Sequence, residues 1–238
     1  SGLMAGVYSD DRGKTWSAEA FIAMPRTRWD NPDSLVPCNW IVWQKPERLS
    51  NGLYFAGFTR WVSPKVRKPA PIPVWWAEAS VVSFMRFENV DEDPPISSLK
   101  IRYIQTGDDA LQVDLIATPG VSVVQEPSLV KLPDGKLFCA LRATTGSPLY
   151  VVSSDAGLTW TKPAPLRYGD GGPLLRHPCS PCPIYQVSDG VYAMLIHNHD
   201  GNFGPWGPRD ASWHRRPLWL LRAAPPPDAV QPVAFSGP

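Results

Sequence analysis

Two cysteines and two histidines have a spacing that could support chemistry. Cys179-Ser-Pro-Cys182 precedes His197 and His199, which are two positions apart. Alternate residues of a strand point to one face, so two thiolates and two imidazoles could meet and hold zinc. The spacing matches no common zinc module, however, and the flanking prolines already explain a rigid loop. We therefore expect structural thiols in a loop and no metal site.

A repeated octet is the most specific motif in the chain. Residues 9–16 read SDDRGKTW and residues 153–160 read SSDAGLTW, so both match S-x-D-x-G-x-T-W. The Asp carboxylate can accept backbone hydrogen bonds, Gly can adopt a left-handed conformation, and Trp can pack underneath. The octet therefore predicts a self-contained turn. Its fixed positions are Ser9, Asp11, Gly13, Thr15 and Trp16, and then Ser153, Asp155, Gly157, Thr159 and Trp160.

A second repeat predicts β-hairpins. Three proline-led apolar segments each run through Asn-Gly or Asp-Gly into another apolar segment. These dipeptides favour the type I′ turn, whose twist matches that of paired strands. The turns are Asn51-Gly52, Asp134-Gly135 and Asp189-Gly190.

The spacing of the two repeats predicts an all-β architecture built from four-stranded units. Gly157 lies 22 residues after Gly135, so hairpin and octet fit one unit, with the octet joining its last two strands. Counting back equally far from Gly13 passes the start of the chain, which predicts an incomplete first unit. The long gap after Gly52 predicts a further, degenerate hairpin around Val81 to Ile104. Together these indicate about four units, some partial.

Composition limits the classes of partner. Lys and Arg number 23 and Asp and Glu number 22 among 238 residues, so nothing favours nucleic acid. The sequence has no apolar run near the roughly 20 residues that cross a bilayer. With 28 prolines and 18 glycines, turns must be frequent. We expect one domain, residues 1–238, with no cofactor; the compartment, secreted or cytoplasmic, and the oligomeric state stay open.

The octets are identified as Asp boxes, the hallmark of sialidases, and the chain resembles the bacterial-neuraminidase-repeat glycosidases. Residues 124–222 carry most of this resemblance through V-Q-E-P-S-L-V-K-L-P-D-G-K-L-F, L-R-A-T, the second octet, C-S-P, a hairpin ending I-H-N, and R-R-P-L. Residues 1–123 match more loosely. The resemblance implies a sialidase-type β-propeller, six-bladed in the family, here truncated at both ends. It also implies that the boxes are structural and lie on the outer rim.

The same resemblance implies site residues. In the family, three arginines bind a sugar carboxylate, a glutamate polarises a tyrosine nucleophile, and an aspartate is the acid and base. Glu126 falls at the glutamate. Arg142 falls at one arginine, whose planar fork suits a carboxylate. Arg216 falls at a later arginine, although Arg215 is adjacent and the register could slip by one, and Asn198 could direct its amide at the sugar.

Some parts of the family site have no match in this sequence. The first arginine and the acid/base aspartate precede the first Asp box in the family, and the tyrosine follows the R-P-L segment. We therefore expect the parent protein to be a glycosidase and this chain alone to be inactive.

Three functions are compatible with these motifs. The first is an exo-acting glycoside hydrolase for a terminal acidic sugar, which predicts that Glu126, Arg142 and Arg216 converge on one cleft. The second is a lyase or hydrolase for uronate polysaccharides, with histidine as the base. The third is a non-catalytic propeller that binds carbohydrate or protein. Its aromatic platform would comprise Trp206, Trp213 and Trp219.

Overall fold

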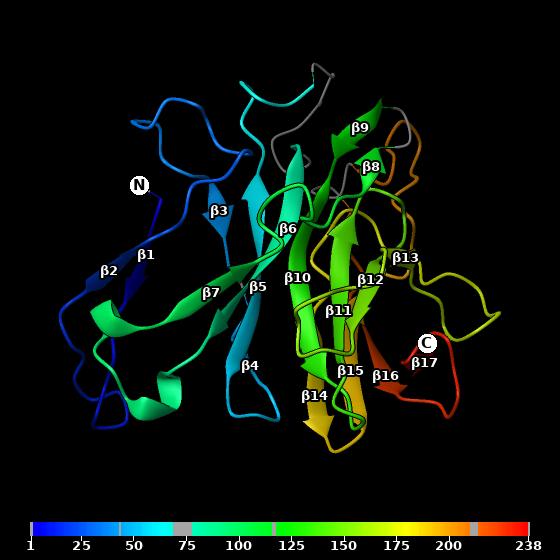
Figure 1. The fold of residues 1–238 in the computed structure, drawn as a ribbon. Helices are drawn as coiled ribbons and strands as arrows, with labels where there is room; N and C mark the ends of the chain where they lie inside the picture. Colours follow the sequence, from blue (N-terminus) through cyan, green and yellow to red (C-terminus); the bar gives the residue numbers. More distant parts are fainter. Residues whose placement is uncertain (1, 43, 69–77, 116–117, 210–213, 238) are drawn as a thin grey trace.

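The computed structural model describes residues 2–42, 44–68, 78–115, 118–209 and 214–237 (Figure 1). Strands dominate these residues, and the helical elements among them are the short 3₁₀ turns η2 (Val90–Glu92) and η3 (Ile96–Ser98). The strands are β1 (Leu3–Gly6), β2 (Ala20–Ala23), β3 (Trp40–Ile41), β4 (Glu47–Arg48), β5 (Tyr54–Trp61), β6 (Ser80–Phe87), β7 (Ile101–Ile104), β8 (Asp114–Leu115), β9 (Thr118–Ser122), β10 (Val124–Lys131), β11 (Leu137–Ala143), β12 (Leu149–Ser153), β13 (Ala164–Pro165), β14 (Ile184–Ser188), β15 (Val191–Ile196), β16 (Trp219–Ala224) and β17 (Ala234–Ser236). The all-β prediction is confirmed.

Three antiparallel sheets each have four strand positions side by side, like the blades of a propeller. Two of them have the orders β10-β11-β12-β13 and β14-β15-β16-β17. The third has the order β3-β5-β6-β7, and β4 also pairs with β5, so β3 and β4 are two pieces of one first strand. A two-stranded sheet, β1-β2, flanks the first Asp box as β12 and β13 flank the second. Three full blades and one partial blade confirm the predicted count.

The predicted hairpins form, but with another turn type. They are β4-β5, β10-β11 and β14-β15, and only the glycine of each turn has a positive φ: 84° at Gly52, 85° at Gly135 and 65° at Gly190. A type I′ turn needs two such residues. In the second hairpin the Gly135 amide donates to the Leu132 carbonyl at 2.9 Å, which fits a type I turn followed by a left-handed glycine.

The additional hairpin predicted in the long gap also forms. It consists of β6 and β7, which pair from Phe84–Ile104 to Phe87–Ile101. These strands are the outer half of the blade that β4 and β5 begin, because β5 and β6 pair along their whole length. The hairpin therefore completes a blade and does not start a new one.

Face-to-face packing of the blades sets the position of the strand ends. One core cluster, which includes Phe138, Tyr192 and Leu221, lies between the last two blades. Another, which includes Phe55 and Leu141, joins the β5-β6 blade to the β10-β11 blade. Burying each such side chain contributes about 1.5–3 kcal/mol. The ends of β5 and β11 both point toward the upper side of the molecule in Figure 1.

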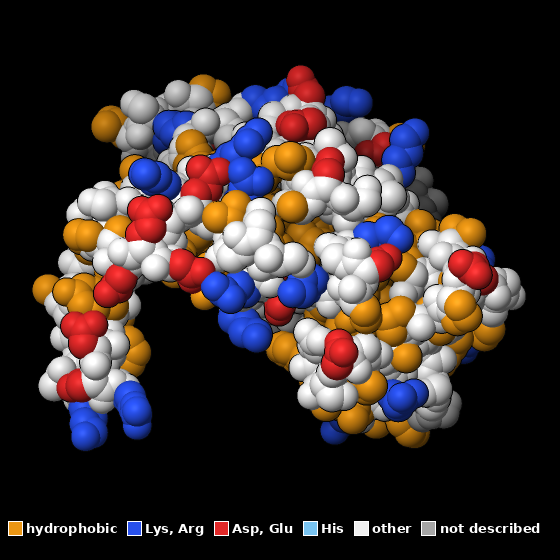
Figure 2. Space-filling model, turned by 60° about the horizontal axis from the view of Figure 1, so that its bottom comes forward, with side chains coloured by type: hydrophobic (Ala, Val, Ile, Leu, Met, Phe, Trp, Pro, Cys, Tyr) orange, Lys and Arg blue, Asp and Glu red, His pale blue; other side chains and the backbone are white. Residues whose placement is uncertain are grey.

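The side of the molecule that carries β1 and β2 projects as an arm. Figure 2 shows this arm set off from the body by a hollow. In the described chain, β1 pairs with β2 on one side and has no strand on the other.

Candidate functional site

Glu126 and Arg142 are in direct contact at the upper end of the β10-β11 hairpin. Arg142 Nη1 lies 2.9 Å from Glu126 Oε1, and the two side chains are 5% and 18% exposed. The hairpin register brings them together, because Arg142 on β11 faces Gln125, the neighbour of Glu126, on β10. The structure thus brings together two of the residues that the sequence analysis singled out.

A bulge in β10 aims the Glu126 side chain. The pairing shifts register between Gln125 and Ser128, and Glu126 has a φ of 49°, which is left-handed. Its amide donates to Thr59 Oγ1 of the neighbouring blade at 2.7 Å. Glu126 Oε2 is buried and accepts no hydrogen bond from the described residues. One carboxylate oxygen therefore accepts a hydrogen bond from Arg142, and the other can still accept a hydrogen bond from another group.

Cys179 supports Arg142 from the other side. Arg142 Nε donates to the Cys179 sulfur at 3.3 Å. Burial alone would lower the pKa of Arg142, but the Cys179 sulfur and the Glu126 carboxylate raise it above its ordinary value. Burial raises the pKa of the Cys179 thiol, although Arg142 opposes this. The thiol is thus a neutral acceptor that fixes the guanidinium, a role that neither the Cys-Ser-Pro-Cys spacing nor the C-S-P segment predicted.

Arg215 interacts electrostatically with this ion pair. Desolvation and then repulsion by Arg142 lower the pKa of Arg215, while attraction to Glu126 acts in the opposite direction. Arg215 and Arg216 are both exposed, and among the described residues no hydrogen bond or salt bridge joins either of them to Glu126 or Arg142. The sequence prediction of Arg216 therefore stays a prediction, with Arg215 as the alternative that lies within electrostatic range of the pair.

Histidines form a row next to the strand ends. His177 and His197 stack with centroids 5.2 Å apart, and His197 and His199 follow at 6.0 Å. Burial is the main cause that lowers the pKa of each, to about 3 for His177. These imidazoles are therefore neutral near pH 7. Asn198, at the end of β15 with a φ of 53°, lies between the last two and is half-buried.

The cysteines predicted to be structural are free thiols. Cys179 and Cys182 are both fully buried, and Cys182 belongs to the core between the last two blades. Within the described residues, no three His, Cys, Asp or Glu side chains are grouped to hold a metal ion. Trp206 and Trp219 are 40% and 38% exposed, whereas Trp213 lies outside the described residues.

A second buried ion pair escaped the sequence analysis. Arg60, near the end of β5, binds both oxygens of Asp30 through Nη1 at 2.8 and 2.7 Å, and its Nη2 donates to the Pro25 carbonyl. Neither side chain of the pair is more than 1% exposed. The pair holds the loop before β3 over the end of β5. Because both side chains are enclosed by protein, we assign the pair a structural role.

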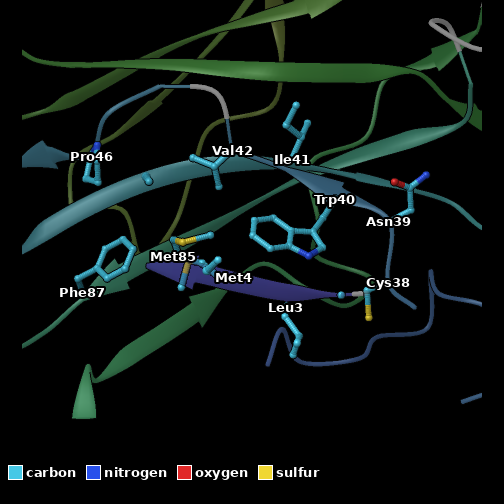
Figure 3. A pocket seen from close by; sticks show the side chains of 13 residues that line it. Leu3, Met4, Cys38, Asn39, Trp40, Ile41, Val42, Pro46, Met85 and Phe87 are labelled. Carbon is cyan, nitrogen blue, oxygen red and sulfur yellow. The ribbon is translucent and has the colours of Figure 1, made fainter. Parts of the chain in front are cut away.

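A large pocket lies apart from these charged residues. It has a volume of about 590 Å³ and lies between β1 and the face of the β3-β5-β6 sheet. Figure 3 shows Met4, Trp40, Met85 and Phe87 around the same space. Among the described residues this lining consists largely of apolar side chains and includes no charged one, so nothing in it favours an acidic sugar.

Comparison with solved structures identifies the fold. The leech intramolecular trans-sialidase, complexed with 2,7-anhydro-Neu5Ac, matches with a TM-score of 0.58 and 18% identity over 98% of this chain and 28% of its own. The Ruminococcus gnavus intramolecular trans-sialidase, in complex with oseltamivir carboxylate, matches with a TM-score of 0.52 and 17% identity over 98% of this chain and 39% of its own. The chain therefore has a sialidase-type β-propeller fold and spans well under half the length of these two proteins.

Other comparisons give no match. No family model and no curated protein matches the sequence. Among the described residues, no helix is long and apolar enough to cross a membrane.

Proposed function

We propose that this chain is the part of a glycosidase that binds a terminal acidic sugar, such as sialic acid, by its carboxylate. The observation that carries the proposal is the sheltered contact between Glu126 and Arg142, with Arg215 in electrostatic range. Two guanidinium groups and one carboxylate give the site a net positive charge, which attracts an anionic ligand.

The two sides of the ion pair would have separate roles. Arg142, held by Cys179 and Glu126, has its guanidinium in a fixed orientation, which reduces the entropy lost when a carboxylate binds beside it. Glu126 Oε2 is the oxygen available to accept a proton from a hydroxyl nucleophile. The acid/base aspartate, the nucleophilic tyrosine and the first arginine have no counterpart matched in this sequence. We therefore expect the chain alone to bind without turnover.

Adjacent arginines provide a matched test of binding. Arg215→Gln should weaken the binding of N-acetylneuraminic acid about tenfold, because it removes one charge-assisted contact. Arg216→Gln, with the same charge change one residue away, should stay within about twofold. Isothermal titration calorimetry measures both, with the methyl ester of the sugar as a control that lacks the negative charge. Equal effects of the two substitutions, or equal binding of the ester, would contradict the proposal.

A second candidate function rests on the histidine row. Because His197 and His199 are neutral near pH 7 and lie at a strand end, either could act as the base of a uronate lyase or hydrolase. Binding of a glucuronate disaccharide in preference to N-acetylneuraminic acid, measured on the same protein, would favour this candidate.

A further inference from the structure

A basic pocket lies at the same end of the blades as the Glu126–Arg142 pair. Its volume is about 280 Å³, and Arg28, Arg67 and Lys68 are among its lining residues. We infer that this pocket binds a second anionic group, a sulfate or a carboxylate, on a saccharide that extends from the sugar held at Arg142. The inference rests on the proposed function for the first sugar. It adds that the substrate is a saccharide with more than one acidic group.

The charge balance of the pocket favours an anion. The acidic residue in its lining is Asp108, which forms a salt bridge with Arg28. Neither Arg67 nor Lys68 forms a salt bridge with a described residue. A further carboxylate, that of Asp114, accepts from the Gly120 amide at 2.9 Å beside Lys68. Three cations and two carboxylates leave the concave site with an excess of positive charge, and the surrounding protein concentrates its field.

Packing holds the basic side chains in place. The Arg28 guanidinium lies 4.8 Å from the centre of the Trp29 ring, and the Trp29 indole donates to the Gly107 carbonyl at 3.1 Å. The Lys68 side chain lies across Gly120, at the position that a Cβ there would occupy. The aromatic ring and the glycine therefore orient two of the three cations.

The strands set the distance from this pocket to the first site. Val62, in the pocket, is three residues after Thr59, whose hydroxyl holds the Glu126 amide. Three residues of extended chain reach at most about 10 Å. Ser122, also in the pocket, bonds to the Ser80 carbonyl at the start of β6 and precedes Glu126 by four residues. One oligosaccharide can therefore contact both sites, which favours a substrate with more than one acidic group.

The test compares saccharides with one and with several anionic groups. Calorimetry would use 3′-sialyllactose, an unsulfated hyaluronan tetrasaccharide and a chondroitin sulfate tetrasaccharide. The double variant Arg67→Gln with Lys68→Gln should lose about tenfold affinity for a tetrasaccharide and should show a weaker dependence on salt, while 3′-sialyllactose binding is unchanged. Loss with both tetrasaccharides indicates a carboxylate, and loss with the sulfated one alone indicates a sulfate.

The control is a double variant with the same loss of charge, Lys14→Gln with Lys162→Gln, which changes an exposed lysine within the first Asp box and another just after the second. An equal loss of tetrasaccharide binding in this control, or no loss in the pocket variant, would overturn the inference. Failure of the Arg215 test with N-acetylneuraminic acid would instead overturn the proposed function, so the two failures are distinguishable.

Discussion

The two Asp boxes contain the same turn in different surroundings. In each, the Thr amide donates to one oxygen of the Asp carboxylate at 2.8 Å and the Thr hydroxyl donates to the other, at 2.7 Å in the first box and 2.6 Å in the second. Yet Trp16 is 62% exposed, whereas Trp160 stacks on Phe84 with ring centroids 4.4 Å apart. The octet thus determines the turn, and the neighbouring blade determines how much of it is buried.

The glycines of the two boxes differ in the same way. Each has a left-handed backbone, with a φ of 83° at Gly13 and 84° at Gly157. A Cβ at Gly13 would make ordinary contact with Trp16, whereas one at Gly157 would overlap the buried ring of Phe55. The second box is therefore part of the core between two blades, and the first is a surface turn.

Replacing the tryptophans should show the largest difference between the boxes. Trp160→Ala removes a ring packed against Phe55 and Phe84 and should lower the free energy of unfolding by about 3 kcal/mol. Trp16→Ala removes an exposed ring and should cost less than about 0.5 kcal/mol. Urea denaturation followed by circular dichroism measures both. A cost for Trp16→Ala as large as that for Trp160→Ala would mean that the first box is buried in solution.

Replacing the glycines should give a smaller difference. Both Gly13→Ala and Gly157→Ala force a side chain into a left-handed backbone, at a cost of about 1–2 kcal/mol. Gly157→Ala must also displace Phe55, which adds about 1–3 kcal/mol of overpacking. Thermal unfolding of the two variants would test this ordering, and the reverse ordering would refute the account of the packing.

Replacing the aspartates should distinguish the boxes least. Hydrogen bonds from Thr15 lower the pKa of Asp11 to about 2, and those from Thr159 and Ser153 lower the pKa of Asp155 despite partial burial. A carboxylate with a lowered folded-state pKa stabilises the fold above its unfolded pKa of about 3.9, and this stability is lost as pH falls through the folded value.

The variants Asp11→Asn and Asp155→Asn should therefore each flatten the fall of melting temperature between about pH 5 and pH 2. Measuring that slope in both variants and in the unchanged chain checks the prediction. A much larger change in one variant would show that the carboxylates are not held by the same local turn.

The features that the sequence predicted correctly depend on contacts between residues close together along the chain. The octets and the hairpins depend on residues close in sequence, and the approach of Glu126 to Arg142 follows from the register of one hairpin. The turn type was wrong because Asp-Gly suits both type I′ turns and turns with a left-handed glycine after type I geometry, and the strand register decides between them.

Contacts between segments that are far apart along the chain leave no comparable pattern in the sequence. Asp30 and Arg60 are 30 residues apart and meet only because a loop folds over β5. Arg215 and Arg216 are adjacent, and neighbouring residues of an extended chain point to opposite sides, so the sequence alone does not select between them. The residues of the basic pocket come from separate loops, from β6 and from β9, so no stretch of the sequence shows their combined charge.

The left-handed backbone of Glu126 lowers the stability of the fold at a position whose carboxylate binds Arg142. A non-glycine residue in this conformation costs of order 1–3 kcal/mol, and folding alone would favour glycine there. A glycine would relieve the strain but would remove the carboxylate that holds Arg142. Selection for a more stable variant of this chain should therefore reach position 126 early and, in doing so, discard the contact between Glu126 and Arg142.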